Sequence, residues 1–265
     1  MASIGSRSGS NSLEVYQYLE SLKLNPAFVN KSGQNALHFL VRKPKQEEII
    51  KYFISKGASI NQADQDGVTP FMNAAAGSQD IELLSALSST VKDINLVNKK
   101  GISALAMAVR SNTPDVVAFL ISKGADINVV DAAGDNLGAY LVQSYSPQRP
   151  EAFDAKIKLL QEKGFNISAP QKNGNTLYHI ALAKNDLALF KRLESLKLDV
   201  NAKNTEGMTV LHKAAMTAKD DRILKYLISI GAKKDVQTEF KETAFDLARE
   251  NEFLSKNNIS IDFLK

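Results

Sequence analysis

Residues 66–76 read DGVTPFMNAAA: a polar turn ending in glycine, then a threonine, then apolar residues at helical spacing. The same order returns in KGISALAMAV (100–109), NGNTLYHIALA (173–183) and EGMTVLHKAA (206–215). The glycines that end these turns are separated by 34, 34, 33, 40 and 33 residues; they are Gly33, Gly67, Gly101, Gly134, Gly174 and Gly207. The chain is therefore built from units of about 34 residues, each of which buries its apolar face against the next.

Each unit predicts two short helices. The turns are rich in Asn, Asp and Gly, which tolerate positive φ and bond to the local backbone. The first helix is expected to start at a side chain that can accept bonds from its free amides, namely Asn35, Thr69, Ser103, Asn136, Thr176, Thr209 or Thr243. The second helix carries apolar residues at helical spacing, as at Ile50, Phe53 and Ile54, and ends in a glycine such as Gly57 or Gly124.

A longer period contains the short one. LESLKL occupies residues 19–24 and again residues 193–198, an offset of 174 residues. At the same offset, IIKYFISKGA (49–58) matches ILKYLISIGA (223–232). Five short units make up this distance, which indicates that a block of repeats was duplicated.

These stretches resemble the ankyrin repeat, and GASIN (57–61) and GADIN (124–128) match its closing signature. Repeat 4 departs most, with Leu137-Gly138-Ala139 where Pro-Leu-His is usual. The resemblance implies an all-α ankyrin-repeat solenoid of helix-turn-helix repeats with short β-turn fingers. It covers a single domain, residues 12–254, that comprises a half repeat at 12–29, repeats starting near 30, 64, 98, 131, 171 and 204, and a C-terminal cap from 238. Residues 255–265 would follow as a tail.

The resemblance also implies a function. Ankyrin proteins bind other proteins through a concave groove and the turn tips, without catalysis, so we expect a non-enzymatic interaction scaffold that is a monomer. At the matching positions repeats 1, 3 and 5 carry cations: Lys31, Arg42, Lys43, Lys99, Lys100, Arg110, Lys172 and Lys184. This pattern predicts an acidic or phosphorylated partner segment. A merely solubilising charged face remains the alternative.

Repeat 4 contains an insertion. From turn glycine to closing glycine it spans 30 residues, and the extra ones are expected between its helices, in VQSYSPQRPEAFDAK (142–156). Pro147 and Pro150 are expected to stop helix continuation there. Tyr140, Tyr145 and Arg149 are residue types enriched at interface anchors. An idle insertion is equally compatible, since surface loops cost little closure entropy.

The sequence offers no catalytic, metal or cofactor site. The three histidines, His38, His179 and His212, occupy the histidine position of the repeat, where the resemblance implies bonds to the backbone near the turns. There is no cysteine and no Gly-rich phosphate loop. A net charge of +4 is too small to predict nucleic-acid binding, and no apolar run is long enough for a membrane span. The lack of cysteine weakly favours a bacterial periplasm or envelope over the cytoplasm.

The beginning of the chain gives two further expectations. Residues 1–11, MASIGSRSGSN, resemble a disordered leader or a cloning remnant. The next segment matches a second helix, so the chain begins halfway through a repeat, and we expect it to be a recognition or targeting arm of a larger protein whose functional domain lies N-terminal to it. A natural half-repeat cap, with Tyr16 and Tyr18 at its edge, is the alternative.

Overall fold

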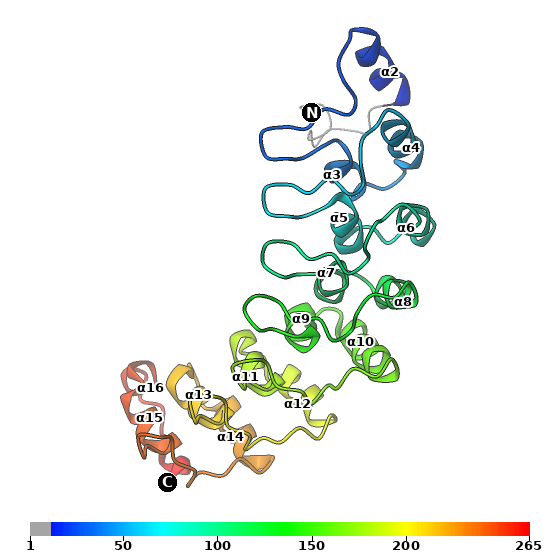
Figure 1. Cartoon of the computed structure of the whole chain (residues 1–265). Helices are drawn as coiled ribbons and strands as arrows, with labels where there is room; N and C mark the ends of the chain where they lie inside the picture. The colour runs from blue at the N-terminus through cyan, green and yellow to red at the C-terminus, as the bar shows by residue number, and fades with distance from the viewer. Residues whose placement is uncertain (1–11) are drawn as a thin grey trace. The chain divides into compact units, whose positions relative to one another are not determined.

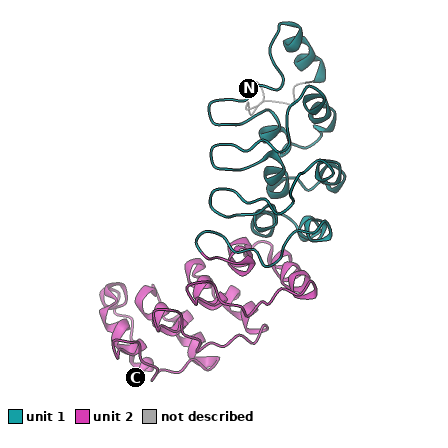
Figure 2. Ribbon diagram, in the orientation of Figure 1, with its two compact units in different colours: residues 1–133 teal, residues 134–265 magenta. Residues whose placement is uncertain are grey.

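The structure, a computed structural model, describes residues 12–265, and the expected leader at residues 1–11 lies outside them. The chain divides into two compact units, unit 1 up to Ala133 and unit 2 from Gly134 to Lys265 (Figure 2). Every regular element in residues 12–265 is an α- or 3₁₀-helix, and one isolated β-bridge joins Val97 to Ser103. The prediction of an all-α repeat fold is confirmed.

Unit 1 holds two layers of helices (Figure 1). The first helices of its repeats pack on one another in succession, and in the other layer α2 packs on α4 and α6 on α8. The helices are α2 (Leu13–Ser21), α3 (Leu37–Leu40), α4 (Glu47–Ser55), α5 (Pro70–Gly77), α6 (Ile81–Ser88), α7 (Ala104–Ser111) and α8 (Pro114–Ser122).

Unit 2 repeats this arrangement, with α9, α11, α13 and α15 packed in succession and α12 packed on α14. Leu264, near the end of the chain, is buried in this unit. The elements are α9 (Leu137–Ser144), α10 (Pro150–Glu162), α11 (Leu177–Ala181), η1 (Leu182–Lys184), α12 (Leu187–Glu194), α13 (Val210–Thr217), α14 (Arg222–Ser229), α15 (Ala244–Glu250), α16 (Glu252–Lys256) and η2 (Asp262–Leu264).

The predicted capping residues start the first helices. Thr69, Ser103 and Thr209 each accept a bond from the amide three residues further on, which satisfies one donor of the first turn. Thr243 forms a reciprocal capping box with Asp246. In repeat 1 the helix starts one residue later than expected, after Ala36, although Asn35 still accepts from the amide of Leu37 at 3.1 Å.

Each turn forms a finger whose shape is set by one polar side chain. In the second finger this side chain is Asp64, whose carboxylate accepts hydrogen bonds from the backbone amides of Asp66 and Val68, both at 2.9 Å. Neighbouring fingers are joined through the backbone. The amides of Gln65, Lys99 and Ala132 donate to carbonyls of the preceding finger, each at 2.9 Å. Figure 1 shows these fingers of unit 1 side by side.

The turn and closing positions lie in the left-handed region, which glycine adopts without steric cost. All six turn glycines have positive φ, as predicted. Where the repeat lacks glycine, a lysine takes the same conformation: Lys241 in the seventh turn, and Lys23 and Lys197 at equivalent places in the two LESLKL copies. These lysines carry strain that glycine would not.

Repeat 4 corrects one prediction. The residues inserted at 142–156 do not form a long loop: α9 runs to Ser144, a short connection follows, and α10 begins at Pro150. α10 has 13 residues, against 8 or 9 in the other well-formed second helices such as α4 and α6. Pro150 occupies the first turn of α10, where its missing N–H and fixed φ favour a helix start. Pro150 therefore begins the second helix of repeat 4 within the segment that we expected to connect the two helices.

Gly101 provides a test of the finger geometry. Its φ is +74°, and a Cβ there would lie 2.6 Å from the backbone nitrogen of Ala132 in the next finger. We expect Gly101→Ala to lower the free energy of unfolding by about 2 kcal/mol or more, from left-handed strain plus a backbone clash. Urea unfolding followed by circular dichroism measures it.

Gly124→Ala is the matched control. It has φ +89°, but a Cβ there would meet no atom within 4 Å. Its cost should be the strain alone, about 1 kcal/mol. Equal losses for the two variants would show that close finger contact does not constrain Gly101.

Candidate protein-binding surface

The fingers and the ends of the first helices in unit 1 carry most of the predicted cations. Lys31, Lys99 and Lys100 are exposed at finger tips, and Arg110 is exposed in the last turn of α7. Their backbones are fixed by the finger bonds: the carbonyl of Lys100, for example, accepts from Ala132. The side chains therefore project from a backbone of defined register.

Arg42 and Lys43 border a groove of about 240 Å³ between the helix connections of repeats 1 and 2. The Arg42 side chain lies across Gly77 of α5, where a Cβ would come within 2.8 Å of its Nε. Glu47 and Asp80 also line this groove, so its charge is mixed. The more uniformly basic part of unit 1 is at the fingers of repeat 3.

In unit 2 the predicted residues do not form one surface. Lys172 and Arg149 are exposed. Lys184 donates from Nζ to the carbonyls of Gln143 at 2.9 Å and Tyr145 at 3.4 Å, so it caps the end of α9. A local sequence pattern could not predict these two hydrogen bonds, because Lys184 lies 41 positions after Gln143 and 39 positions after Tyr145 along the chain.

Tyr140 and Tyr145, expected as interface anchors, lie inside unit 2 with only 3% and 5% of their surface exposed. Tyr145 packs edge-on against Phe153 of α10, with ring centroids 5.4 Å apart. Burial, together with the nearby Asp186, raises its pKa. Both tyrosines stabilise the longer repeat, and we leave them out of the proposed binding surface.

The extended α10 contains a buried cation. Lys156 is 4% exposed, and burial, reinforced by the nearby charge of Arg149, lowers its pKa to about 8. The burial of Lys156 does not follow from the sequence pattern, which places this residue at the end of the connection expected between the two helices of repeat 4. Lys156 is buried because α10 extends from Pro150 to Glu162 and so includes this residue on its buried face.

The three histidines hold neighbouring repeats together. Nδ1 of His212 accepts from the amide of Thr209 at 3.1 Å, and its Nε2 lies 2.9 Å from the carbonyl of Val236 in the next finger. His38 makes the same pair of contacts with Asn35 and Val68, and His179 makes them with Thr176 and Met208. This pattern selects the neutral tautomer with hydrogen on Nε2.

Protonation would break this pattern, since Nδ1 must accept. Burial lowers the pKa of all three imidazoles below the ordinary 6.5. The direction of the pH dependence follows from these lowered pKa values. Well above pH 6.5 the histidines are neutral in both the folded and the unfolded state, and their contribution to the free energy of unfolding is fully present. Below it the unfolded chain takes up protons that the native chain refuses, so stability falls.

We therefore expect urea unfolding to show a lower stability at pH 5.5 than at pH 7.5, and each native imidazole to titrate below 6.5 by NMR. His212→Asn is the control, because asparagine keeps an acceptor near Nδ1 and does not titrate in this range. It should reduce the pH dependence. A native imidazole pKa above 6.5 would contradict the assignment.

Residues 12–265 contain no group of three or more His, Cys, Asp or Glu side chains placed to hold a metal ion. None of the helices there is long and apolar enough to cross a membrane.

One exposed aromatic was missed by the sequence reasoning. Phe240 is 81% exposed in the seventh turn, next to Lys241, at a tip where the other repeats carry polar or small residues. Met216, at the end of α13, is 46% exposed. A groove of about 390 Å³ runs along α11, η1 and α13 of the same unit, lined in part by Asn175, Thr217 and Lys219. The signal was present in TEFK (238–241), which breaks the polar pattern of the turns.

Comparison with known proteins settles the family. The family model for ankyrin repeats (3 copies) matches residues 37–131 and 151–253. The chain belongs to the ankyrin repeat family. Ankyrin repeats generally mediate protein–protein interaction, and they are typically non-enzymatic.

Several relatives are similar over much of the chain. Mouse B-cell lymphoma 3 protein homolog is 27% identical over 224 residues, which are 82% of this chain and 47% of that protein. Mouse Rabankyrin-5 is 24% identical over 202 residues, 72% of this chain and 17% of that protein. The crystal structure of the ankyrin repeat domain of Bcl-3 has a TM-score of 0.60 at 21% identity, and the match covers 85% of this chain and all of that one. It shows a shared fold.

Another similar protein is an enzyme. Phosphocholine transferase AnkX of Legionella pneumophila is 28% identical over 123 residues, 46% of this chain and 12% of that protein. The chain thus spans less than half the length of each of these three relatives.

Proposed function

We propose that the chain is a non-enzymatic scaffold that binds another protein through its finger tips and the exposed ends of its first helices. The observation that carries this proposal is the row of exposed cations on unit 1, at Lys31, Arg42, Lys99, Lys100 and Arg110. All five side chains are exposed, and that of Arg42 also lies across Gly77 of the next repeat.

The backbone of this surface supports its use in recognition. Each finger of unit 1 is tied to the next by a backbone hydrogen bond. Fixed fingers lose little conformational entropy when a partner binds, so more of the contact energy appears as affinity. A repeat surface of this kind offers several shallow contacts in a row.

The charge indicates the chemistry of the partner. Repeat 3 presents Lys99, Lys100 and Arg110, none of which forms an ion pair recorded among residues 12–265. Such cations favour binding of an acidic or phosphorylated partner segment, and they raise the rate at which this segment associates with the chain. We expect the free chain to be a monomer whose partner is a protein.

A second function is favoured by the lengths of the relatives. The matched regions make up 12% to 47% of the three proteins described above, and one of them is named as an enzyme. The chain would then be the recognition arm of a larger protein whose activity lies in another domain. Both functions place partner binding on the same fingers.

The binding surface is tested by reversing its charge. We expect Lys99→Glu, Lys100→Glu and Arg110→Glu together to weaken binding of the acidic partner by about tenfold or more, and to flatten the salt dependence of its association rate. The partner is first captured from the source organism on the wild-type chain, and affinities are then measured at several salt concentrations.

The matched control changes net charge by the same amount elsewhere in unit 1. Lys51, Lys92 and Lys123 are exposed on the second-helix side, away from the fingers. Reversing these three should leave the affinity within about twofold, since only complementary charges at the interface direct encounter. Equal effects of the two triple variants, or no effect of the first, would overturn the assignment of the site.

A further inference from the structure

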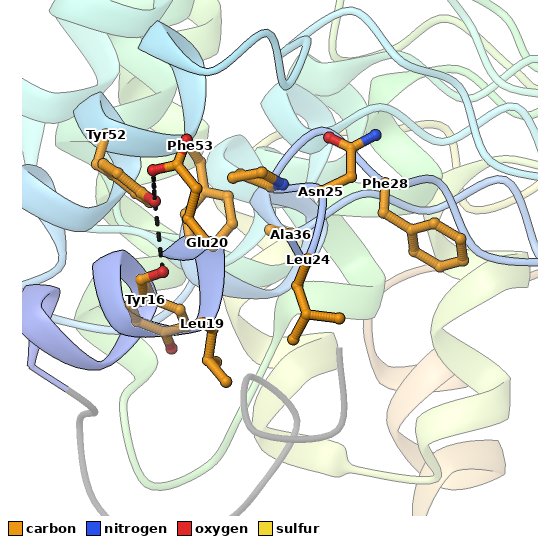
Figure 3. Close-up of a pocket in the computed structure, with 10 residues that line it drawn as sticks. Tyr16, Leu19, Glu20, Leu24, Asn25, Phe28, Ala36, Tyr52 and Phe53 are labelled. Atoms are coloured by element: carbon orange, nitrogen blue, oxygen red, sulfur yellow. Dashed lines mark hydrogen bonds between the residues drawn. The ribbon is translucent and has the colours of Figure 1, made fainter. Parts of the chain in front are cut away.

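The apolar pocket between α2 and α4 of unit 1 has a volume of about 330 Å³, and the side chains of its walls already contact each other (Figure 3). The ring of Tyr16 packs edge-on against Phe53, with centroids 5.2 Å apart. Glu20 accepts from the hydroxyl of Tyr52 at 2.7 Å and pairs with Lys56 at 2.7 Å. These contacts stabilise the packing of α2 on α4. A chemically different feature is found in a finger of unit 2.

Asn173 and Gly174 form the only Asn-Gly step in the sequence, at the tip of the finger of repeat 5 (finger 5, residues 171–174). The side chain of Asn173 is exposed. Asparagine is a thermolabile residue, because the nitrogen of the following residue can attack its side-chain amide. Glycine hinders this attack least, since it has no side chain and its backbone angles are the freest. The sequence thus places a reactive pair at this finger tip.

Hydrogen bonds at the tip both favour and restrain this reaction. Oδ1 of Asn173 accepts from the amide of Asn175 at 3.1 Å, which draws electrons from Cγ and makes this carbon easier to attack. The nitrogen of Gly174 donates to the carbonyl of Gln171 at 2.8 Å, and this bond must break before the nitrogen can turn toward Cγ. We therefore expect the reaction to proceed when finger 5 opens locally.

The main chain of Asn173 also joins two fingers. Its carbonyl accepts from the amide of Thr205 at 3.0 Å and from the Thr205 hydroxyl at 2.9 Å, both in the finger of repeat 6 (finger 6, residues 204–207). The two fingers are in close contact, since a Cβ on Gly174 would lie 2.8 Å from the backbone nitrogen of Thr205. An additional main-chain atom at Asn173 would therefore displace one finger from the other.

We propose that Asn173 is a self-modifying site, whose deamidation loosens the link between fingers 5 and 6. The nitrogen of Gly174 bonds to Cγ of Asn173, the Cγ–Nδ2 bond breaks, and the Gly174 amide proton leaves with the side-chain nitrogen as ammonia. Water then opens the resulting ring at one of its two carbonyls and returns a proton to the Gly174 nitrogen. Opening at Cγ gives aspartate. Opening at the main-chain carbonyl gives isoaspartate, in which Cβ and Cγ become part of the main chain.

The two products differ in their effect on unit 2. Aspartate keeps the main chain and adds a negative charge at the tip, next to Lys172. Isoaspartate lengthens the main chain at the residue that accepts from Thr205, so this acceptor moves away from its donors. The link between the two fingers is therefore weakened as the molecule ages. The site lies in unit 2 and does not depend on partner binding at the fingers of unit 1.

Mass spectrometry of the full chain tests the modification. The chain is incubated in mildly alkaline buffer, where the amide proton is lost more easily, and is digested at acidic pH, which suppresses further reaction. We expect deamidation at Asn173 to be at least about tenfold faster than at Asn204, which is buried and followed by threonine. Asn173→Gln keeps an amide at the tip but must form a larger ring, so this variant should not react. Equal rates at Asn173 and Asn204 would overturn the proposal.

Thr205→Val tests the dependence of the reaction on finger opening. It removes the hydroxyl that donates to the carbonyl of Asn173 and keeps a similar shape, so finger 5 should open more often and deamidate about two- to tenfold faster. Thr217→Val is the matched control, because its hydroxyl donates to the carbonyl of Lys213 within α13. The control should change the rate by less than about twofold. Equal rates in the two variants would contradict the role of the finger bonds.

Hydrogen exchange tests the effect of the modification on the fingers. The isoaspartate form is separated by chromatography and identified by fragmentation. We expect the amide of Thr205 to exchange at least about tenfold faster in this form than in the unmodified chain, with the amide of Lys99 in unit 1 as the unchanged reference. Asn173→Asp adds the charge without lengthening the main chain, so it should leave the exchange of Thr205 within about twofold. Unchanged exchange of Thr205 in the isoaspartate form would overturn the proposal.

Discussion

The fingers of unit 1 are locked together by one backbone hydrogen bond per step, from the amide of one turn to a carbonyl of the turn before it, and in unit 2 the amides of Lys172 and Thr205 donate to the carbonyls of Gly134 and Asn173 in the same way. This bond requires close approach of two backbones, which explains the glycine in almost every turn. Gly101 shows the limit: its position leaves no room for a methyl group beside Ala132. The 34-residue period is thus imposed by backbone geometry as well as by apolar packing.

The histidines extend the same constraint into the helix layer. His212 joins the start of its own helix to the next finger through its two ring nitrogens, and His38 does the same in unit 1. Burial keeps these rings neutral. The residues most similar to catalytic groups in this sequence are therefore structural.

The sequence predicted the parts of the fold that repeat. The turn glycines have the expected positive φ, and Thr69, Ser103 and Thr209 cap their helices as expected. The errors lie where repeat 4 departs from the period. Periodicity could not reveal that Pro150 begins an extended helix, because a proline both ends one helix and starts another. The burial of Tyr145 and the capping role of Lys184 depend on contacts between residues far apart in sequence, which a local pattern does not contain.

Hydrogen exchange of the finger amides measures the central constraint directly. The amides of Gln65 and Lys99 lie in exposed turns but donate to the preceding finger. If these bonds lock the repeats, the two amides will exchange slowly, with opening free energies close to those of helices α5 and α7 in the same unit. Exchange at the rate of unprotected turns would show that helix packing alone holds the repeats together, and would contradict this account.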